Sequence, residues 1–400
     1  MKYIITLVFC INLVHGLLAQ NVIEGRVIDA TDKTEIPFVN ITSKEEKNGS
    51  SSYLDGSFII TVTKFPATLV FSHVNYGKTE ITFTSNKSTA EVMLTPLPVI
   101  LDEVTINALD PERIVAECYQ NIASSPTRVM AKGFYRQWTK NDDIYSEILE
   151  SFYTSKITPK GIEAATIAQG RYAVKDNREK GLMAYQNFSV FTNTFPLVQT
   201  TERSFITPLR KDAEEFFVLK LQQVIDNPDS SKVYVVAFTP KQNNSKPGFC
   251  GQLFIDDRYN LIRFKGSIDD SRFQPLTTID PQRVSSLKLT VDAFCDNRVG
   301  ESILLENMKV DLQYKYRYND KDSRQIQTSS FYFTYEMDTM PSGSAVSHTE
   351  PAANDYAAIN QTAYDDTFWE NTKVLSQTPI EKEIIKQFRK SKLFRKIFQK

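Results

Sequence analysis

The chain has 400 residues, of which 24% are charged, and its formal net charge is −1. This length allows two or three domains with a sizeable core, and the near-neutral charge excludes the basic field that recruits nucleic acid. Phe and Tyr, present 26 and 18 times, favour β structure over disorder. We therefore expect a globular, mainly β protein without a nucleic-acid partner.

The first residues have the pattern of a secretory signal. Lys2 precedes an apolar core at residues 4–14, and Ala19 provides the small residue of a cleavage site. Residues 1–19 are therefore predicted to be a signal peptide, too short for a membrane-spanning helix. The mature protein is expected outside the cytoplasm, in the periplasm or at the outer membrane or cell surface.

Residues 20–96 alternate between apolar and polar side chains in short runs. Apolar residues such as Val27 and Phe58 recur at every second position, and turn signals such as Asp55-Gly56 interrupt them. A period of two with such turns is the pattern of short antiparallel strands. About seven strands in this length predict a small two-sheet β-sandwich.

Four segments of this region, VIEGRVID, IPFVNI, DGSF and FSHVNY, follow one another within residues 22–76. In this order they resemble the carboxypeptidase regulatory-like domain, a transthyretin-like sandwich common in secreted Bacteroidetes proteins. The resemblance implies a prealbumin- or Ig-like fold. It implies no peptidase chemistry, because the catalytic domain that would carry it does not accompany the segments.

Residues 97–110 are predicted to be a linker, since prolines at positions 96 and 98 end the sandwich. A helix is expected over residues 111–123, with Asp110 as its cap and Pro111 in its first turn. One face of this helix is apolar and carries Ile114, Val115, Cys118 and Ile122.

From about residue 130 the alternation returns and predicts one large antiparallel sheet, either open or curved into a half-barrel. Its strands are expected at residues 132–139, 144–153, 166–174, 215–225, 232–239, 249–256, 260–268, 286–295, 302–317 and 327–337. Helix and sheet together form a predicted domain over residues 111–376. The pieces GFYRQW, YSEILESFY and AYDDTFWEN resemble uncharacterised envelope proteins that carry the same N-terminal domain.

Aromatic residues alternate along several predicted strands, so some of them are expected to face outward. An exposed aromatic row can stack on sugar rings or dock a protein. The candidate residues for such a ligand or partner surface are Tyr135, Trp138, Tyr145, Tyr332 and Trp369. The alternative is that the same side chains form the core on one face and ordinary sheet surface on the other.

Two segments near the C-terminus differ from this β pattern. Residues 342–360 are small and polar and are expected to form a mobile loop. Residues 377–400 predict a basic helix, whose last twenty residues contain eight Lys or Arg and two Glu. Peripheral contact with an anionic membrane is one interpretation, through Phe388, Lys392, Phe394, Arg395 and Phe398. The other interpretation is a solvated C-terminal helix.

Residue types that carry catalysis or hold metals are scarce. After the signal peptide only His73 and His348 remain, and neither stands in an HExxH spacing, so no catalytic residue, metal site or cofactor is predicted. Acidic doublets at 142–143, 256–257, 269–270 and 365–366 lie beside turns. Because adjacent strand residues point to opposite faces, we interpret these doublets as solvated turn formers.

Two further features leave alternatives open. Glu147 and Glu150 lie among aromatic residues, and pairing with Arg136 is expected in preference to a catalytic role. Cys250 and Cys295 either form one disulfide bridge or remain free thiols, because an odd and sparse set of cysteines makes no disulfide framework.

We interpret the chain as a non-enzymatic envelope protein with a binding or scaffolding role toward an envelope protein or a glycan. One alternative is a periplasmic carrier or chaperone of lipid or lipoprotein, with an apolar groove between helix and sheet. A more remote alternative is a carboxylate-dependent glycosidase, which needs two carboxyl groups that converge in a cleft.

Overall fold

The computed structural model describes most of the chain. The described residues are 21–45, 49–97, 99–100, 109–175, 182–185, 188–193, 195–227, 230–273, 282–318, 323–339, 354–363, 365–371 and 379–390. The predicted signal peptide, residues 1–19, lies outside them.

The N-terminal region is a two-sheet sandwich, as predicted. Its strands are β1 (Asn21–Asp29), β2 (Asn40–Ser43), β3 (Gly49–Ser51), β4 (Ser57–Val62), β5 (Ala67–His73), β6 (Tyr76–Phe83) and β7 (Lys87–Leu94). One sheet has the order β4-β1-β7 and the other the order β3-β2-β5-β6. Apolar residues from both sheets, among them Val27, Ile41 and Phe71, fill the space between them.

Two glycines explain local features of the sandwich. Gly56 has a φ of 70° in the turn before β4, a conformation that glycine adopts without strain. Gly25 lies at a register shift between β1 and β7, where a Cβ atom would approach the carbonyl oxygen of Ala90 to 2.1 Å. The β1–β7 pair is parallel, so the expectation of a wholly antiparallel sandwich is wrong there. The chain crosses between the two sheets after β6 and therefore enters β7 in the direction of β1.

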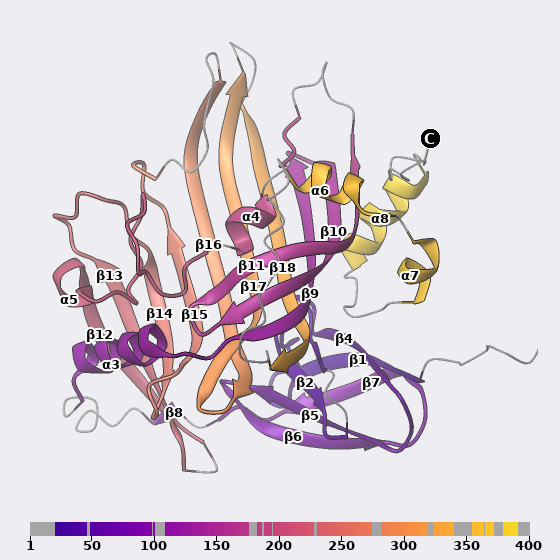
Figure 1. Cartoon of the computed structure of the whole chain (residues 1–400), viewed down its shortest axis with the longest axis horizontal. Helices are drawn as coiled ribbons and strands as arrows, with labels where there is room; N and C mark the ends of the chain where they lie inside the picture. The colour runs from indigo at the N-terminus through magenta and orange to yellow at the C-terminus, as the bar shows by residue number, and fades with distance from the viewer. Residues whose placement is uncertain are drawn as a thin grey trace, which may run out of the picture.

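The second region is built on one open sheet with the order β11-β10-β9-β18-β17-β16-β15-β14-β13-β12-β8 (Figure 1). Its strands are β8 (Val99–Ile100), β9 (Val129–Asn141), β10 (Ile144–Thr158), β11 (Gly161–Val174), β12 (Phe217–Asp226), β13 (Lys232–Pro240), β14 (Cys250–Asp256), β15 (Leu261–Ile268), β16 (Gln282–Val299), β17 (Ser302–Tyr318) and β18 (Arg324–Thr339). Its paired strands run antiparallel, and each strand predicted from the alternation is present. β8 lies within the stretch expected to be a linker.

Short helices cover parts of this sheet. They are α3 (Pro111–Ser124), α4 (Phe188–Asn193), α5 (Ala213–Phe216), α6 (Asp355–Gln361), α7 (Asp366–Asn371) and α8 (Pro379–Lys390). Asp110 caps α3 by accepting a hydrogen bond from the Glu112 amide, and the predicted apolar face of α3 lies in the core of the sheet. No helix within the described residues combines the length and the apolar character that crossing a membrane requires.

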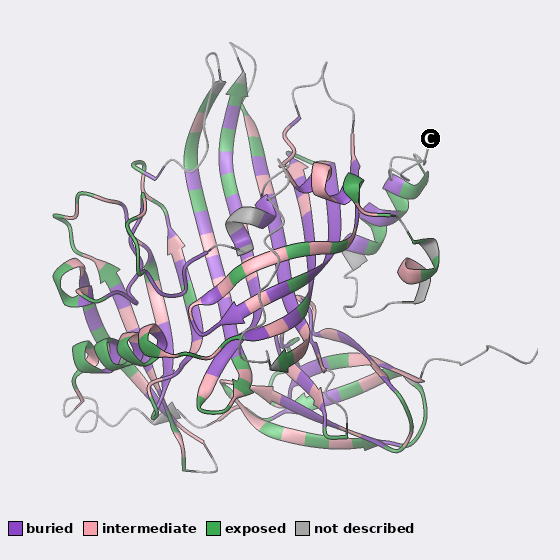
Figure 2. Cartoon of the chain, in the orientation of Figure 1, coloured by how far each residue is buried: buried purple, intermediate pink, exposed green. Residues whose placement is uncertain are grey.

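The sandwich packs against one end of the central strands (Figure 1). The ring of Phe38, in the sandwich, lies 5.4 Å from that of Phe294 on β16 and 5.5 Å from that of Phe331 on β18. The Tyr53 ring meets Phe331 edge-on at 5.1 Å. Figure 2 shows buried residues on these central strands among intermediate and exposed ones, and Phe38, Phe294 and Phe331 are all buried. The two regions therefore share an aromatic interface.

One expectation from the sequence is wrong. Residues 342–360 are not a continuous loop, because 355–361 form α6, with Asn354 capping the helix by accepting from the Ala357 amide. Of the two alternatives for Cys250 and Cys295, the structure has the free thiols, because the two residues lie on β14 and β16, which β15 separates.

Candidate functional site

A hollow of about 890 Å³ lies between the sandwich and the large sheet. Its walls come from β2, β5 and β6 on one side and from β13 to β17 on the other. A second hollow of about 520 Å³ shares Asn40, Thr42, Arg298 and Glu306 with the first. We call the two hollows together the interdomain groove.

Two bulges aim acidic side chains at this groove. The β16–β17 ladder shifts register twice within a few residues. At the first shift, Phe294 pairs with Asn307 and Cys295 pairs with Leu305. Glu306 of β17 lies between these two pairs and has no pairing partner on β16. At the next, Asp296 of β16 is the extra residue, between Cys295 and Asn297. Bulges bend a strand and redirect side chains, and here both extra residues line the groove.

Asp296 links the two regions from inside the groove. Its Oδ2 accepts hydrogen bonds from Asn40 Nδ2 and Ser72 Oγ of the sandwich, each of 2.8 Å. Desolvation by the surrounding protein raises the pKa of Asp296. These two hydrogen bonds and the charges of Lys78 and Arg298 oppose the shift. Part of the Asp296 side chain remains open to solvent, so the residue is accessible from the groove.

Glu306 is different, because it is buried and incompletely paired. Its side chain is 2% exposed, and Oε1 has no hydrogen-bond partner among the described residues. Burial, and secondly the nearby Asp296, raises the pKa of the Glu306 carboxyl well above its ordinary value, which favours its protonated form. Both amide atoms of Asn307, which is fully buried, also have no partner among those residues.

Unpaired buried polar atoms cost about 1–3 kcal/mol each. Native proteins therefore pair most of them, with protein groups, water or a bound molecule. Three such atoms occur on Glu306 and Asn307, at a bulge whose Glu306 side chain lines both hollows. Of these three atoms, Glu306 Oε1 belongs to a side chain that lines the groove.

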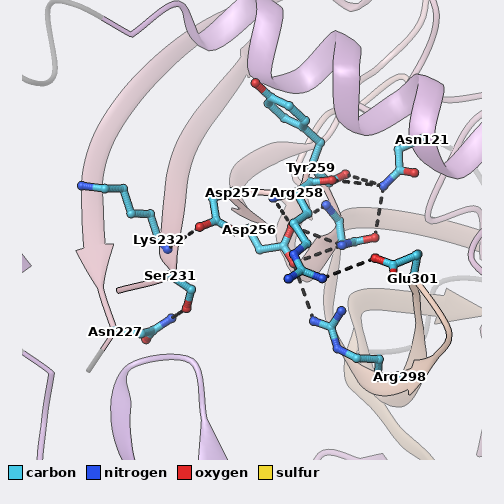
Figure 3. Close-up of polar contacts among 11 residues, drawn as sticks. Asn121, Asn227, Ser231, Lys232, Asp256, Asp257, Arg258, Tyr259, Arg298 and Glu301 are labelled. Carbon is cyan, nitrogen blue, oxygen red and sulfur yellow. Dashed lines mark hydrogen bonds and ion pairs between the residues drawn. The ribbon is translucent and has the colours of Figure 1, made fainter. Parts of the chain in front are cut away.

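One end of the groove is formed by the turn between β14 and β15 (Figure 3). Asp256 Oδ1 accepts from the amides of Arg258 at 3.0 Å and Asn260 at 2.7 Å. Asn121 of α3 donates to Asn260 Oδ1 at 3.1 Å, which anchors the turn to the helix. Arg298 lies 3.9 Å from Asp256. Asp256 thus acts as the turn former that the sequence predicted.

His73 lines the same groove as a neutral ring. Burial, and secondly Arg263, lowers the pKa of His73 to about 3, and its Nδ1 accepts a hydrogen bond from the Asn75 amide at 3.2 Å. The imidazole packs edge-on to Tyr76 with 5.2 Å between ring centroids, and against Phe294 at 5.6 Å. Its surroundings therefore favour packing over proton transfer.

The larger hollow gathers an imidazole and several carboxyl groups in one place. These groups belong to His73, Asp256, Asp257, Asp296 and Glu306. The sequence predicted the acidic doublets to be turn formers, and it did not predict that acids from distant segments would gather in one hollow. The physical reason is the docking of the sandwich over two bulged strands. Within the described residues, no cluster of His, Cys, Asp and Glu is arranged to hold a metal ion.

The predicted aromatic surface is mostly covered. Tyr135 and Tyr332 are 0% exposed, so the expectation of an exposed ligand surface is wrong for both, because segments folded over the sheet bury them. Trp138 and Tyr145 are half-buried and pack beside α8. Trp369 is also half-buried, with the Arg171 guanidinium 4.2 Å from its ring. None of these five lines the interdomain groove.

The C-terminal helix is docked rather than free. Phe388 is 1% exposed and packs with Ile384 and Ile385 against Ile148 and Ala173 of the sheet. The expected membrane contact through Phe388 is therefore wrong, because the apolar face of α8 is used to fold the protein. The other residues of that expectation, Lys392, Phe394, Arg395 and Phe398, lie outside the described residues.

Glu150 pairs with Arg136, as predicted, at 2.8 Å, and also with Arg171. Burial opposes ionisation of Glu150, but the two guanidinium groups outweigh it and hold its pKa at about 2. Arg136 also binds Glu381 of α8 at 3.2 Å. These buried charges join β9, β10, β11 and α8.

Glu147 does not join this pairing, because it faces the other side of β10. Thr139 Oγ1 donates to Glu147 Oε2 at 2.8 Å and Gln137 Nε2 donates at 3.0 Å, and Tyr356 donates to Oε1. Burial raises the pKa of Glu147. The nearby Asp355 on α6 binds Ser189. This buried polar network holds α4 and α6 on the sheet.

The sequence reasoning missed two groove residues, Asp296 and Glu306, and also Asn307, which lies next to Glu306 at the bulge. They lie on opposite strands of a long hairpin and form no doublet or motif. The sequence did contain one signal. Glu306 is an acidic residue in the interior of the predicted strand 302–317, and it lies opposite the end of the predicted strand 286–295. Such a polar interruption of an apolar alternation often marks a bulge or a site.

Comparison with known proteins identifies the first region. Residues 23–106 match the family model of the CarboxypepD_reg-like domain, which confirms the resemblance found in the sequence. The chain is also similar to TonB-dependent receptor P39 of Formosa agariphila, with 30% identity over 106 residues that cover 26% of this chain and 10% of that protein. The chain thus spans about a tenth of the length of this curated relative.

Solved structures give weaker similarities. A LolA superfamily protein from Nitrosomonas europaea has 12% identity and a TM-score of 0.23, and the match covers 58% of this chain and 96% of that chain. A DUF1329 family protein from Desulfovibrio piger has 9% identity and a TM-score of 0.24, with 59% and 96% covered. At these TM-scores neither match assigns a fold or a function to this chain.

Proposed function

We propose that this chain is a non-enzymatic protein of the cell envelope that binds its ligand in the interdomain groove. The signal-like N-terminus and the regulatory-like sandwich support the envelope location. The observation that carries the proposal is the buried Glu306 carboxyl, whose Oε1 is unpaired among the described residues and which lines both hollows between the two regions.

Binding is supported over bond cleavage by what the other polar groups of the groove do. Asp296 is occupied by hydrogen bonds from Asn40 and Ser72, and the Asp256 carboxylate is occupied by its own turn. His73 is held neutral among aromatic rings. A general base must be free to reach the proton that it removes, whereas fixed polar groups suit recognition.

The alternative of a lipid or lipoprotein carrier has less support. Such a role requires an apolar groove between α3 and the sheet. The apolar face of α3 instead packs with sheet residues in one core, through Ile114, Val115, Cys118 and Ile122.

Site-specific crosslinking in cells tests the proposal. A photo-reactive amino acid at Thr42, which lines both hollows, is expected to capture an envelope component. The same residue at the exposed Glu91 on β7 serves as the matched control and should capture nothing. Equal capture at both positions would contradict a groove site.

A second measurement tests the non-enzymatic part. The purified mature protein is expected to release neither reducing ends from glycans nor new amino termini from peptides. A robust hydrolytic activity that disappears in the Asp296→Asn variant would overturn this part of the proposal and would revive the glycosidase hypothesis.

A further inference from the structure

The charges that line the larger hollow nearly cancel. They belong to Asp256, Asp257, Asp296, Glu306, Lys78, Arg258 and Arg298. Burial favours the protonated form of Glu306, and the other charged groups of the lining are three carboxylates and three cations. A lining of this kind gives neither an anion nor a cation a clear electrostatic advantage, so the groove favours a neutral ligand.

The unpaired Glu306 carboxyl indicates which neutral chemistry fits. A protonated carboxyl both donates and accepts hydrogen bonds. Glu306 lines both hollows, whereas Asn307, which follows it at the bulge, lines neither. A hydroxyl group also donates and accepts, so a hydroxyl of a bound molecule satisfies the Glu306 carboxyl.

Other parts of the groove match a molecule with many hydroxyl groups. Asn40 and Thr42 lie beside Glu306 in both hollows. The half-buried rings of His73 and Tyr76 are part of the wall. Aromatic side chains give an apolar surface beside polar groups, and a sugar ring has the same division between its C–H faces and its hydroxyl edge.

We infer that the interdomain groove binds a neutral saccharide, with a sugar hydroxyl group hydrogen-bonded to Glu306 at the β16–β17 bulge. This inference rests on the proposed binding function and specifies its ligand. A protein segment in the same groove would satisfy the proposed function and contradict the inference.

The first experiment asks which glycans bind. The mature protein is applied to an immobilised array of neutral, anionic and cationic glycans, and the strongest neutral glycan is then titrated by calorimetry. We expect neutral glycans to bind at least about tenfold more tightly than charged glycans of the same length. Preference for charged glycans, or no binding to any neutral one, overturns the inference and leaves the Thr42 crosslinking result standing.

The second experiment places the saccharide at the bulge. Glu306→Gln keeps a neutral group that donates and accepts, so its affinity should stay within about threefold of wild type. Glu306→Leu removes these hydrogen bonds and should weaken binding about tenfold or more. Glu91→Leu, at an exposed position on β7, is the control for the same chemical change outside the groove.

Folding is checked separately, because Glu306 is buried. The thermal midpoint of each variant is measured, and affinities are compared well below the lowest midpoint. If Glu306→Gln loses affinity as fully as Glu306→Leu, a charged carboxylate is required and the inference fails. If Glu306→Leu binds as well as Glu91→Leu, the saccharide lies elsewhere and the inference also fails.

Discussion

The Tyr53 hydroxyl donates a hydrogen bond of 2.5 Å to Glu381 Oε1, across 328 positions of the chain. Glu381 Oε2 accepts from Arg136 at 3.2 Å. One buried carboxylate on α8 therefore contacts both the sandwich and the large sheet. The C-terminal helix is a structural part of the junction between the two regions.

Replacing Glu381 tests this junction. Glu381→Gln removes the carboxylate that Arg136 contacts at 3.2 Å in the buried junction, and we expect a loss of about 3 kcal/mol in the free energy of unfolding. Tyr53→Phe removes one hydrogen bond and should cost about 1 kcal/mol. Urea unfolding measures both. Glu383→Gln, exposed on the same helix, is the control, and an equal effect at positions 381 and 383 would contradict the junction.

The docking of α8 predicts how the C-terminus responds to truncation. A chain that ends after Gln377 lacks Glu381 and the buried Phe388, so its thermal midpoint should fall clearly. A chain that ends after Lys390 keeps both residues and should unfold like the full-length protein.

Phe388→Ala alone should cost about 3–5 kcal/mol, whereas Arg389→Ala, at an exposed position, should cost little.

The same truncations separate folding from membrane contact. Co-sedimentation with anionic vesicles is measured for the full-length protein and for the chain that ends after Lys390. If the C-terminal tail contacts membranes, the shorter chain loses binding while keeping its stability. Equal and negligible sedimentation of both chains would remove the membrane interpretation.

Asp355 predicts a pH dependence of stability. Burial raises the pKa of this carboxyl from 3.8 to about 6, the hydrogen bonds from Ser189 oppose the rise, and the nearby Glu147 adds to it. Because the pKa is higher in the folded state, the unfolded state releases its proton first as the pH rises. Asp355 therefore lowers stability progressively between about pH 4 and pH 6, by about 3 kcal/mol in total.

Asp355→Asn should remove this contribution. The variant should become more stable relative to wild type as the pH rises from 4 to 7, in urea unfolding curves recorded at each pH. Asp143→Asn replaces a fully exposed carboxylate and is the matched control. A constant difference between wild type and Asp355→Asn over this pH range would show that Asp355 does not titrate as described.

The three cysteines that follow the predicted signal peptide should react very differently. Cys250 is exposed, while Cys118 and Cys295 are buried free thiols. Burial raises the pKa of both buried thiols, and the thiolate is the reactive form. A maleimide should label one thiol per native chain and three after denaturation, as read by mass spectrometry. Cys250→Ser should abolish native labelling, and persistent labelling of that variant would contradict the assigned burial.

Many local features of the fold were predictable from the sequence. Alternation through Val27 and Phe58 predicts strands because a strand exposes successive side chains on opposite faces. Asp110 and Pro111 predict the start of α3 because a helix leaves its first amides unpaired. The pairing of Glu150 with Arg136 was also predictable, since a buried carboxylate needs a compensating charge.

The sequence by itself determined the β character of the chain, the sandwich and the position of α3, because turn chemistry, capping and periodicity act over a few residues. Only the tertiary structure decided which faces are covered and which acids meet. Phe388 is buried because α8 docks on β10, and Asp296 and Glu306 meet because two bulges and the docked sandwich bring them to one groove. Such contacts depend on the arrangement of segments far apart in the chain, which no local pattern encodes.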